Sequence, residues 1–376
     1  MNINRMIDTF IEMVKIDSVS RNEGAFHDYL KGLFKDLGLE VYEDNTMETT
    51  GLGGNNLIFT LKGNTEGTPL FFSAHTDTVE PGVNIEPICV DGILSSKGDT
   101  ILGADNKAGI AILVEMIRHI QENDMAHPTL EFVFTPGEEI GLVGAAALDH
   151  SKLISQYGLV LDSNGPVGGL TMASPTLMTL SSTIHGKSAH AGLEPEKGIS
   201  SITVLADIIN NLELGRLNAN TTANVGVISG GSATNVVCDK AEMKAELRSI
   251  DLQEFEVTKQ KMLDTIEAIA SKHGATHETT TQILSQGYQF TQDMPFVQLL
   301  VDALSVYDLT PNYMVSGGGS DANAFNAGGK QAINISIGYE EIHTTNEYIP
   351  VQEMKRCVLL CLELIKRMAQ GNHDLK

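Results

Sequence analysis

Residues 70–79 read LFFSAHTDTV. The apolar segment 70–74 predicts a buried strand, and the polar residues His75 and Asp77 follow it directly. The same arrangement recurs in the first part of the chain, where apolar strands alternate with helical segments. Strands are predicted at residues 56–61, 70–74, 130–135 and 159–161, and helices at 24–38 and 108–120. This alternation is typical of α/β folds, in which helices cover a largely parallel sheet.

The pattern changes after about residue 174. Strands are predicted at 176–185, 223–229, 236–249 and 275–284, with helices at 198–214 and 252–273, an order of βαββαβ that is typical of ferredoxin-like units. From residue 295 the α/β pattern resumes, with a helix at 295–306, a strand at 332–337 and a helix at 351–369. The sequence therefore predicts one α/β domain of residues 1–174 and 289–376, interrupted by an inserted domain of residues 175–288.

Composition excludes several classes of function. The chain has 376 residues and a formal net charge of −23, which repels nucleic acid and anionic membranes, so neither is expected as a partner. Charged residues interrupt the apolar positions of segment 1–20, which does not resemble a signal peptide, and no apolar stretch is long enough to span a bilayer. The four cysteines form no C-x-x-C pair. A cytoplasmic location is therefore expected.

Acidic residues and histidines cluster at the predicted strand ends. Taken singly, each has an ordinary explanation, since Asp105 could be a helix N-cap and adjacent glutamates are usually solvated. Together they come from five segments, and the carboxyl ends of parallel strands meet at one edge of a sheet. Four of these residues follow strands and one opens a helix: His75, Glu138, Asp162 and His343, and Asp105.

Close carboxylates without a basic partner raise each other's pKa, so an acidic cluster of this kind is costly. A divalent cation removes that cost, and two cations account for the number of acids better than one. Imidazole and carboxylate ligands suit Zn²⁺, with Mn²⁺ or Co²⁺ as alternatives. The sequence therefore predicts a site for two divalent metal ions.

The same segments carry a family resemblance. They are HTD at 75–77, GADNKAG at 103–109, PGEEIG at 136–141, LDSNG at 161–165, and the late His343. As a set they resemble the dinuclear zinc exopeptidase family of peptidase T, the aminoacylases and succinyl-diaminopimelate desuccinylase, and they are most similar to peptidase T-like proteins. The resemblance covers nearly the whole chain. It implies that the inserted domain is a lid and dimerisation domain, and hence that the protein forms a homodimer.

The resemblance also implies roles for individual residues. His75 and Asp162 would bind one metal ion, Glu139 and His343 the other, and Asp105 would bridge both. Asp77 would orient the His75 ring, and Glu138 would act as the general base rather than as a ligand. The peptide bond between Asp105 and Asn106 would be cis.

The substrate would be contacted mainly from the inserted domain. The resemblance assigns this role to His190 in HGKSAHAG, Asn235, Arg248, and Gly318 and Gly319 in the turn SGGGSD at 316–321. His185 is the rival of His190, but it falls within a predicted strand and is expected to pack there. Peptidase T carries an arginine in the glycine turn where this chain has Gly317, so strict tripeptide specificity is not implied.

Three functions remain open from the sequence. The first is a metallo-aminopeptidase that acts on short peptides. The second is an amidohydrolase that removes acyl groups from N-acyl amino acids or related small amides. The third is a metal-binding or dimerisation scaffold without activity, which would be expected to have lost the base or a ligand. Glu138 and all the implied ligand positions are present.

Overall fold

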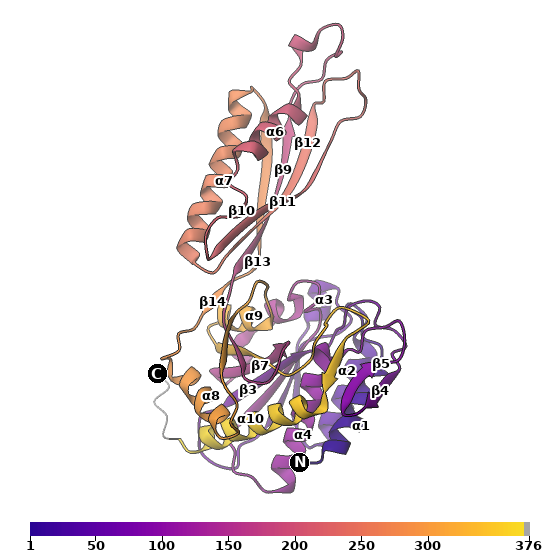
Figure 1. Cartoon of the computed structure of the whole chain (residues 1–376), viewed down its shortest axis with the longest axis vertical. Helices are drawn as coiled ribbons and strands as arrows, with labels where there is room; N and C mark the ends of the chain where they lie inside the picture. Colours follow the sequence, from indigo (N-terminus) through magenta and orange to yellow (C-terminus); the bar gives the residue numbers. More distant parts are fainter. Residues whose placement is uncertain (372–376) are drawn as a thin grey trace. The chain divides into compact units, whose positions relative to one another are not determined.

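The computed structural model describes residues 1–371 and divides into two compact units. The first unit comprises Met1–Ala173, Gln289–Ser316 and the chain from Ser320 onward. The second comprises Ser174–Tyr288 together with Gly317–Gly319. Figure 1 shows that the first and last parts of the chain, in indigo and yellow, belong to the same unit. Within residues 1–371, no helix is long and apolar enough to cross a membrane.

A nine-stranded sheet forms the centre of the first unit. Its order is β1-β2-β6-β3-β7-β16-β8-β14, with β15 paired to β8. The strands β6, β3, β7 and β16 run parallel to one another, and the strands beyond them on either side include antiparallel pairs. The bounds are β1 Glu40–Glu43, β2 Leu57–Leu61, β3 Leu70–His75, β6 Leu130–Thr135, β7 Tyr157–Ser163, β8 Gly169–Ser174, β14 Tyr288–Gln289, β15 Asn312–Val315 and β16 Gln331–Ser336.

Helices cover both faces of this sheet. Phe71 packs against Phe325, whereas Ala74, three residues further along β3, lies against Gly109. Since side chains alternate along a strand, the helices that carry Phe325 and Gly109 lie on opposite faces. The helices are α1 Ile3–Val14, α2 Gly24–Asp36, α3 Thr46–Thr50, α4 Ala104–Glu122, α5 Val143–Ala147, α8 Pro295–Ser305, α9 Asp321–Ala327 and α10 Val351–Ala369. A small sheet of β4 Pro87–Val90, β5 Ile93–Ser96 and β17 Tyr348–Pro350 completes the unit.

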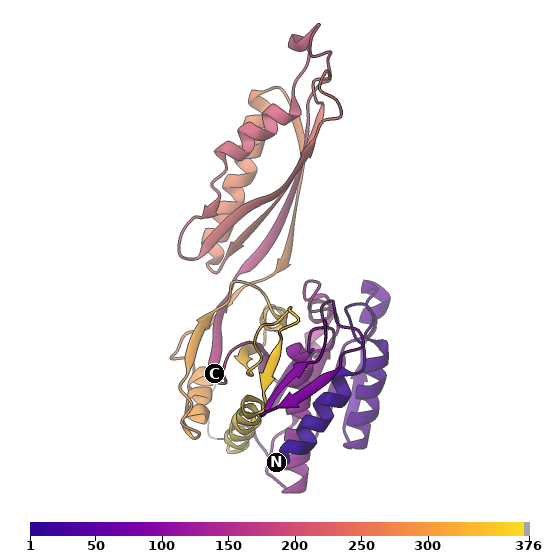
Figure 2. The ribbon, with the colours of Figure 1, turned by 45° about the vertical axis from the view of Figure 1, so that its right-hand side comes forward.

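The second unit is a five-stranded antiparallel sheet of order β10-β11-β12-β9-β13 with two helices on one face. Figure 2 shows α6 and α7 on the same side of this sheet. Burial alternates along β9 and β12, as expected for a sheet with one covered face. The elements are β9 Thr176–His185, α6 Ser201–Asn211, β10 Gly215–Arg216, β11 Thr221–Gly230, β12 Lys240–Ser249, α7 Leu252–Lys272 and β13 Thr276–Ser285.

The predicted α/β class and the inserted βαββαβ unit are both confirmed. Some of the predicted elements were too long, and two of them show why. The strand expected at 236–249 begins at Lys240, because Val237 and Cys238 are used in loop contacts, with the Val237 N–H donating to Ala189. The helix expected from residue 198 begins at Ser201, because the Ser200 side chain caps it by accepting from the Thr203 N–H.

Candidate metal centre

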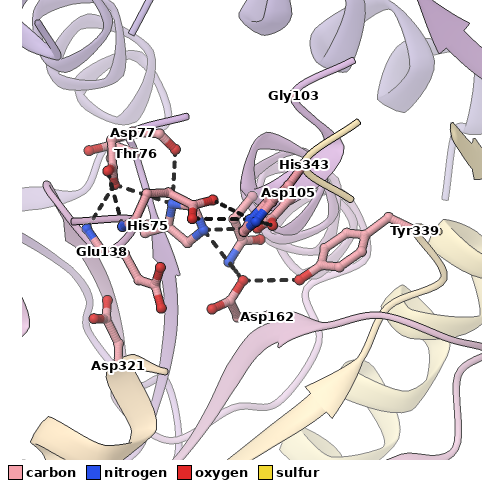
Figure 3. Close-up of polar contacts among 12 residues, drawn as sticks. His75, Thr76, Asp77, Gly103, Asp105, Glu138, Asp162, Asp321, Tyr339 and His343 are labelled. Atoms are coloured by element: carbon pink, nitrogen blue, oxygen red, sulfur yellow. Dashed lines mark hydrogen bonds and ion pairs between the residues drawn. The ribbon is translucent and has the colours of Figure 1, made fainter. Parts of the chain in front are cut away.

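His75 ends β3 and anchors the site. Its side chain is buried, and its Nδ1 lies 2.9 Å from the main-chain oxygen of Asp77. That contact turns Nε2 toward two carboxylates, at 2.9 Å from Oδ1 of Asp105 and 3.4 Å from Oδ1 of Asp162 (Figure 3). Burial acts to lower the pKa of His75, but the facing carboxylates, with Asp162 foremost, raise it well above its usual value. The ring is therefore held in one orientation and aimed at acidic oxygens.

Asp105 lies between two imidazoles. Its Oδ1 faces His75, and its Oδ2 lies 3.2 Å from Nε2 of His343. His343 also lies 3.1 Å from the carboxylate of Glu139. Contacts with these carboxylates, Asp105 first and Glu139 next, raise the pKa of His343 to about 10. The peptide bond between Asp105 and Asn106 is cis, as predicted.

The predicted ligands form overlapping groups. His75, Asp105 and Asp162 offer ligand atoms that all lie within 4.8 Å of one another, and Asp105, Glu139 and His343 do the same. Asp105 is common to both groups. Within residues 1–371 no lysine or arginine forms an ion pair with these carboxylates, and the basic groups that face them are the imidazoles of His75 and His343. Two imidazoles and several carboxylates at this spacing fit divalent metal ions.

Glu138 is the remaining acid of this edge. It too lies close to His75 and Glu139, within the same 4.8 Å limit. Burial, followed by the charge of Asp162, raises its pKa well above the usual range for a glutamate. A carboxyl group in this environment holds a proton more tightly than an ordinary glutamate does, which suits a group that accepts a proton and passes it on.

Asp77 supports this arrangement in more than one way. One carboxylate oxygen lies 3.3 Å from Nδ1 of His75, so it contributes to orienting the ring, although the nearer partner is the main-chain oxygen of Asp77. The same carboxylate accepts the N–H groups of Glu138 at 3.0 Å and Glu139 at 3.2 Å, and the Ser20 hydroxyl at 2.6 Å. Asp77 therefore also holds the turn that carries the two glutamates.

Several polar residues around the site were missed by sequence reasoning, and three of them lie close to Asp162 or Glu138. The Tyr339 hydroxyl donates to Oδ1 of Asp162 at 3.0 Å, and the Asn334 side chain binds the main chain of Asp162 on both sides. Asp321 accepts from the Thr135 hydroxyl, and Figure 3 shows its carboxyl group beside Glu138. The aspartate that ends SGGGSD was a usable signal, whereas an asparagine inside strand β16 carried none.

The predicted substrate residues all lie in the second unit. The main chains of the His190 and Asn235 segments are adjacent, since the Ala191 N–H donates to the Asn235 oxygen at 3.0 Å. The Arg248 guanidinium pairs with Glu246 and donates to the Gly317 oxygen at 2.8 Å. The neighbouring Gly318 oxygen accepts from the Ser174 hydroxyl. Gly319 belongs to the same segment. The role of all five residues stays a prediction.

Comparisons with known proteins agree with this architecture. A model described as peptidase family M28 matches residues 56–170, and one described as a peptidase dimerisation domain matches residues 173–274. Aminopeptidase PepT from Bacillus cereus has 42% identity, a TM-score of 0.94, and coverage of 98% of this chain and 99% of that one. A tripeptidase from Staphylococcus aureus has 38% identity, a TM-score of 0.93 and the same coverage. The Bacillus subtilis protein YqjE is 40% identical over 98% of this chain and its own full length.

The fold and the acidic cluster, together with these matches, define the class of the protein as a metal-dependent peptidase, a hydrolase. The proteins that match this chain also include several named peptidase T. The chain belongs to the peptidase T-like family, as its motifs predicted.

Proposed function

We propose that the protein is an aminopeptidase that removes the N-terminal residue from short peptides, with two divalent metal ions in the cluster around Asp105. The observation that carries this proposal is the set of two ligand groups that share Asp105 and form no ion pair with a lysine or arginine among residues 1–371. His75 and Asp162 would hold one ion, and Glu139 and His343 the other. Zn²⁺ is the ion that best suits these ligands. When bound, such ions supply a nucleophilic water near neutral pH and polarise the substrate carbonyl.

Glu138 then performs the proton transfers. Its carboxylate accepts a proton from the attacking water and returns it to the nitrogen of the leaving amine as the peptide bond breaks. Asp77 holds the main chain of Glu138, so the base is fixed relative to the His75 ring. The half-buried setting of this carboxyl group, together with the charge of Asp162, raises its affinity for the proton that it must carry.

A substrate screen tests this proposal. The metal-free protein is supplied with Zn²⁺, Mn²⁺ or Co²⁺ and offered di- and tripeptides, the same peptides with an acetylated N-terminus, and N-acyl amino acids. Free peptides should be hydrolysed and acetylated peptides should not, since an aminopeptidase requires a free amino terminus. Preference for N-acyl amino acids would establish an amidohydrolase instead. Metal binding without hydrolysis of any of these compounds would leave only a scaffold.

We also propose that the protein forms a homodimer through the second unit. The family model for a peptidase dimerisation domain covers most of this unit. The strand β11 pairs with β10 only near its start, so Val227 and Ile228 lie on an open edge, 53% and 64% exposed. Beside this edge is a groove of about 580 Å³, lined mainly by apolar residues of α6, β11 and β12 such as Ile202, Leu205 and Ile209. An open edge next to an apolar groove suits a second copy of the same chain.

Light scattering on two variants tests the dimer. Ile228→Glu places a charge on the open edge and should convert the dimer to a monomer at micromolar concentration. Ile283→Glu is the matched control, because Ile283 is 53% exposed on β13 at the other edge of the same sheet. A wild-type monomer, or equal dissociation of both variants, would refute the proposed dimer surface.

A cytoplasmic location also remains a prediction.

A further inference from the structure

Glu347 is a buried carboxylate to which none of the preceding roles applies. Its side chain is 1% exposed and lies four residues after His343, next to the start of β17. Its Oε2 accepts the N–H groups of Leu102 at 2.7 Å and Gly103 at 2.8 Å, and its Oε1 accepts the N–H of Asp105 at 2.9 Å. One carboxylate therefore holds three main-chain donors of the segment that leads into α4.

The need for an acceptor at this point is general. The first N–H groups of a helix have no partner within the helix, and a negative charge is favoured near them. A local serine or aspartate normally meets that need. Here the acceptor comes from more than 240 residues away in sequence, as the separation of 242 residues between Asp105 and Glu347 shows. Capping alone therefore does not explain why this particular segment supplies it.

The groups at the two ends of this contact do explain it. The Asp105 main chain is held by Glu347, and the Asp105 carboxylate faces His343 at 3.2 Å. His343 itself lies in a segment between β16 and β17 that has little regular structure, and its backbone adopts a left-handed conformation with φ of 63°. A few contacts near the end of this segment restrain it, including the pairing of Glu340 with Tyr348. Glu347 ties the same segment to Asp105.

We propose that Glu347 is a positioning residue that fixes the Asp105 carboxylate relative to the His343 imidazole. It thereby sets the affinity of the second metal ion, the one that Glu139 and His343 would hold. This inference rests on the proposed metal centre. Residues that orient metal ligands from behind commonly change metal affinity or activity by about 10–100-fold when they are replaced. Glu347 would do so through the main chain of Asp105 and through the segment that carries His343.

Glu347→Gln is the variant that tests it. A glutamine has a single oxygen, so it can accept from Leu102 and Gly103 or from Asp105, while its NH₂ group faces the remaining donor. The matched control is Glu131→Gln. Glu131 is also buried and also accepts two adjacent N–H groups, those of Ile154 at 3.1 Å and Ser155 at 2.8 Å, but it lies near the amino end of β6.

The readout is isothermal titration of each metal-free protein with Co²⁺. Wild type and Glu131→Gln should bind two ions with matching affinities, and Glu347→Gln should bind the second ion about 10–100-fold more weakly. With peptide substrate, the kcat of Glu347→Gln should recover as Co²⁺ is raised, with KM little changed. Should that variant fail to fold, Glu347→Asp keeps both oxygens but shortens their reach, and it should weaken the second ion as well.

Two results would overturn the proposal. One is wild-type affinity for both ions in a folded Glu347→Gln or Glu347→Asp protein. The other is equal weakening in Glu131→Gln, which would mean that any lost buried carboxylate has this effect. A wild type that binds two Co²⁺ ions but hydrolyses no peptide would refute the proposed function alone, since the titration still decides the role of Glu347. A wild type that binds no Co²⁺ would refute both.

Discussion

The two units carry their polar residues in opposite ways. In the first unit, His75, Asp105 and Asp162 are buried or nearly so and converge on one another. In the second, His190 is exposed, and its Nδ1 accepts from the nearby N–H of Gly192. Burial of charged groups is costly unless something compensates for it, whereas an exposed histidine costs nothing. The buried cluster thus points to a ligand, and an exposed residue does not reveal its role by its surroundings.

The largest effect is expected from a substitution within the buried cluster of the first unit, and it would sharpen the contrast between the two units. Glu138→Gln keeps the size of the side chain but removes the proton acceptor, so kcat should fall by about 10²–10⁴-fold with metal content unchanged. Its neighbour provides the control, because Glu139→Gln should lose metal instead. Kinetics and elemental analysis on both proteins measure this, and an unchanged kcat in Glu138→Gln would remove it from the role of base.

A substitution of the exposed His190 in the second unit tests the other side of this contrast between the units. If His190 contacts the substrate as the family resemblance implies, His190→Ala should lower kcat by about 10²–10³-fold, the range seen when a donor to a developing oxyanion is lost. Metal content should stay the same. His185→Ala, in β9 of the same unit, should retain activity. Wild-type kinetics in His190→Ala would mean that the second unit contributes structure only.

A smaller effect is expected from residues that contact the proposed metal ligands without binding the metal themselves. Asp77→Asn leaves one oxygen for the N–H groups of Glu138 and Glu139, and it presents an NH₂ group on the other side. Activity or metal affinity should fall by about 10–100-fold. Ser20→Ala removes only the hydroxyl that donates to the same carboxylate, and it should cost less. Equal losses in the two variants, measured by metal titration and kcat, would contradict a specific role for the carboxylate.

The smallest effect concerns stability at acid pH. Burial, helped by the charge of Lys31, lowers the pKa of His27 from 6.5 to about 4. As the pH falls from 6.5 to 4, the unfolded chain gains a proton here that the folded protein does not, so stability is lost across this range, on the order of 2–3 kcal/mol in total. In His27→Gln, the free energy of unfolding, measured by denaturant titration, should decline less steeply between pH 6.5 and 4. An identical slope would show that His27 does not contribute.

Much of the candidate metal site could be predicted because its residues follow strands. His75, Asp162 and His343 come after apolar segments, and strands that lie parallel in a sheet bring their carboxyl ends to one edge. The partners behind them could not be predicted in the same way. Glu347 and Asn334 act through the main chain of other residues, and which main-chain groups lie within reach depends on how the loops pack.

The sequence by itself determined the α/β class, the inserted βαββαβ unit and the acidic and histidine residues proposed as metal ligands, because periodicity and the position of polar residues after strands are local properties. Only the tertiary structure decided which atoms meet. It showed that the Asp77 carboxylate holds the turn of the two glutamates, and that Tyr339 donates to Asp162. The reason is that a hydrogen bond requires atoms to lie within about 3 Å. Chain folding sets that distance between residues that are far apart in the sequence.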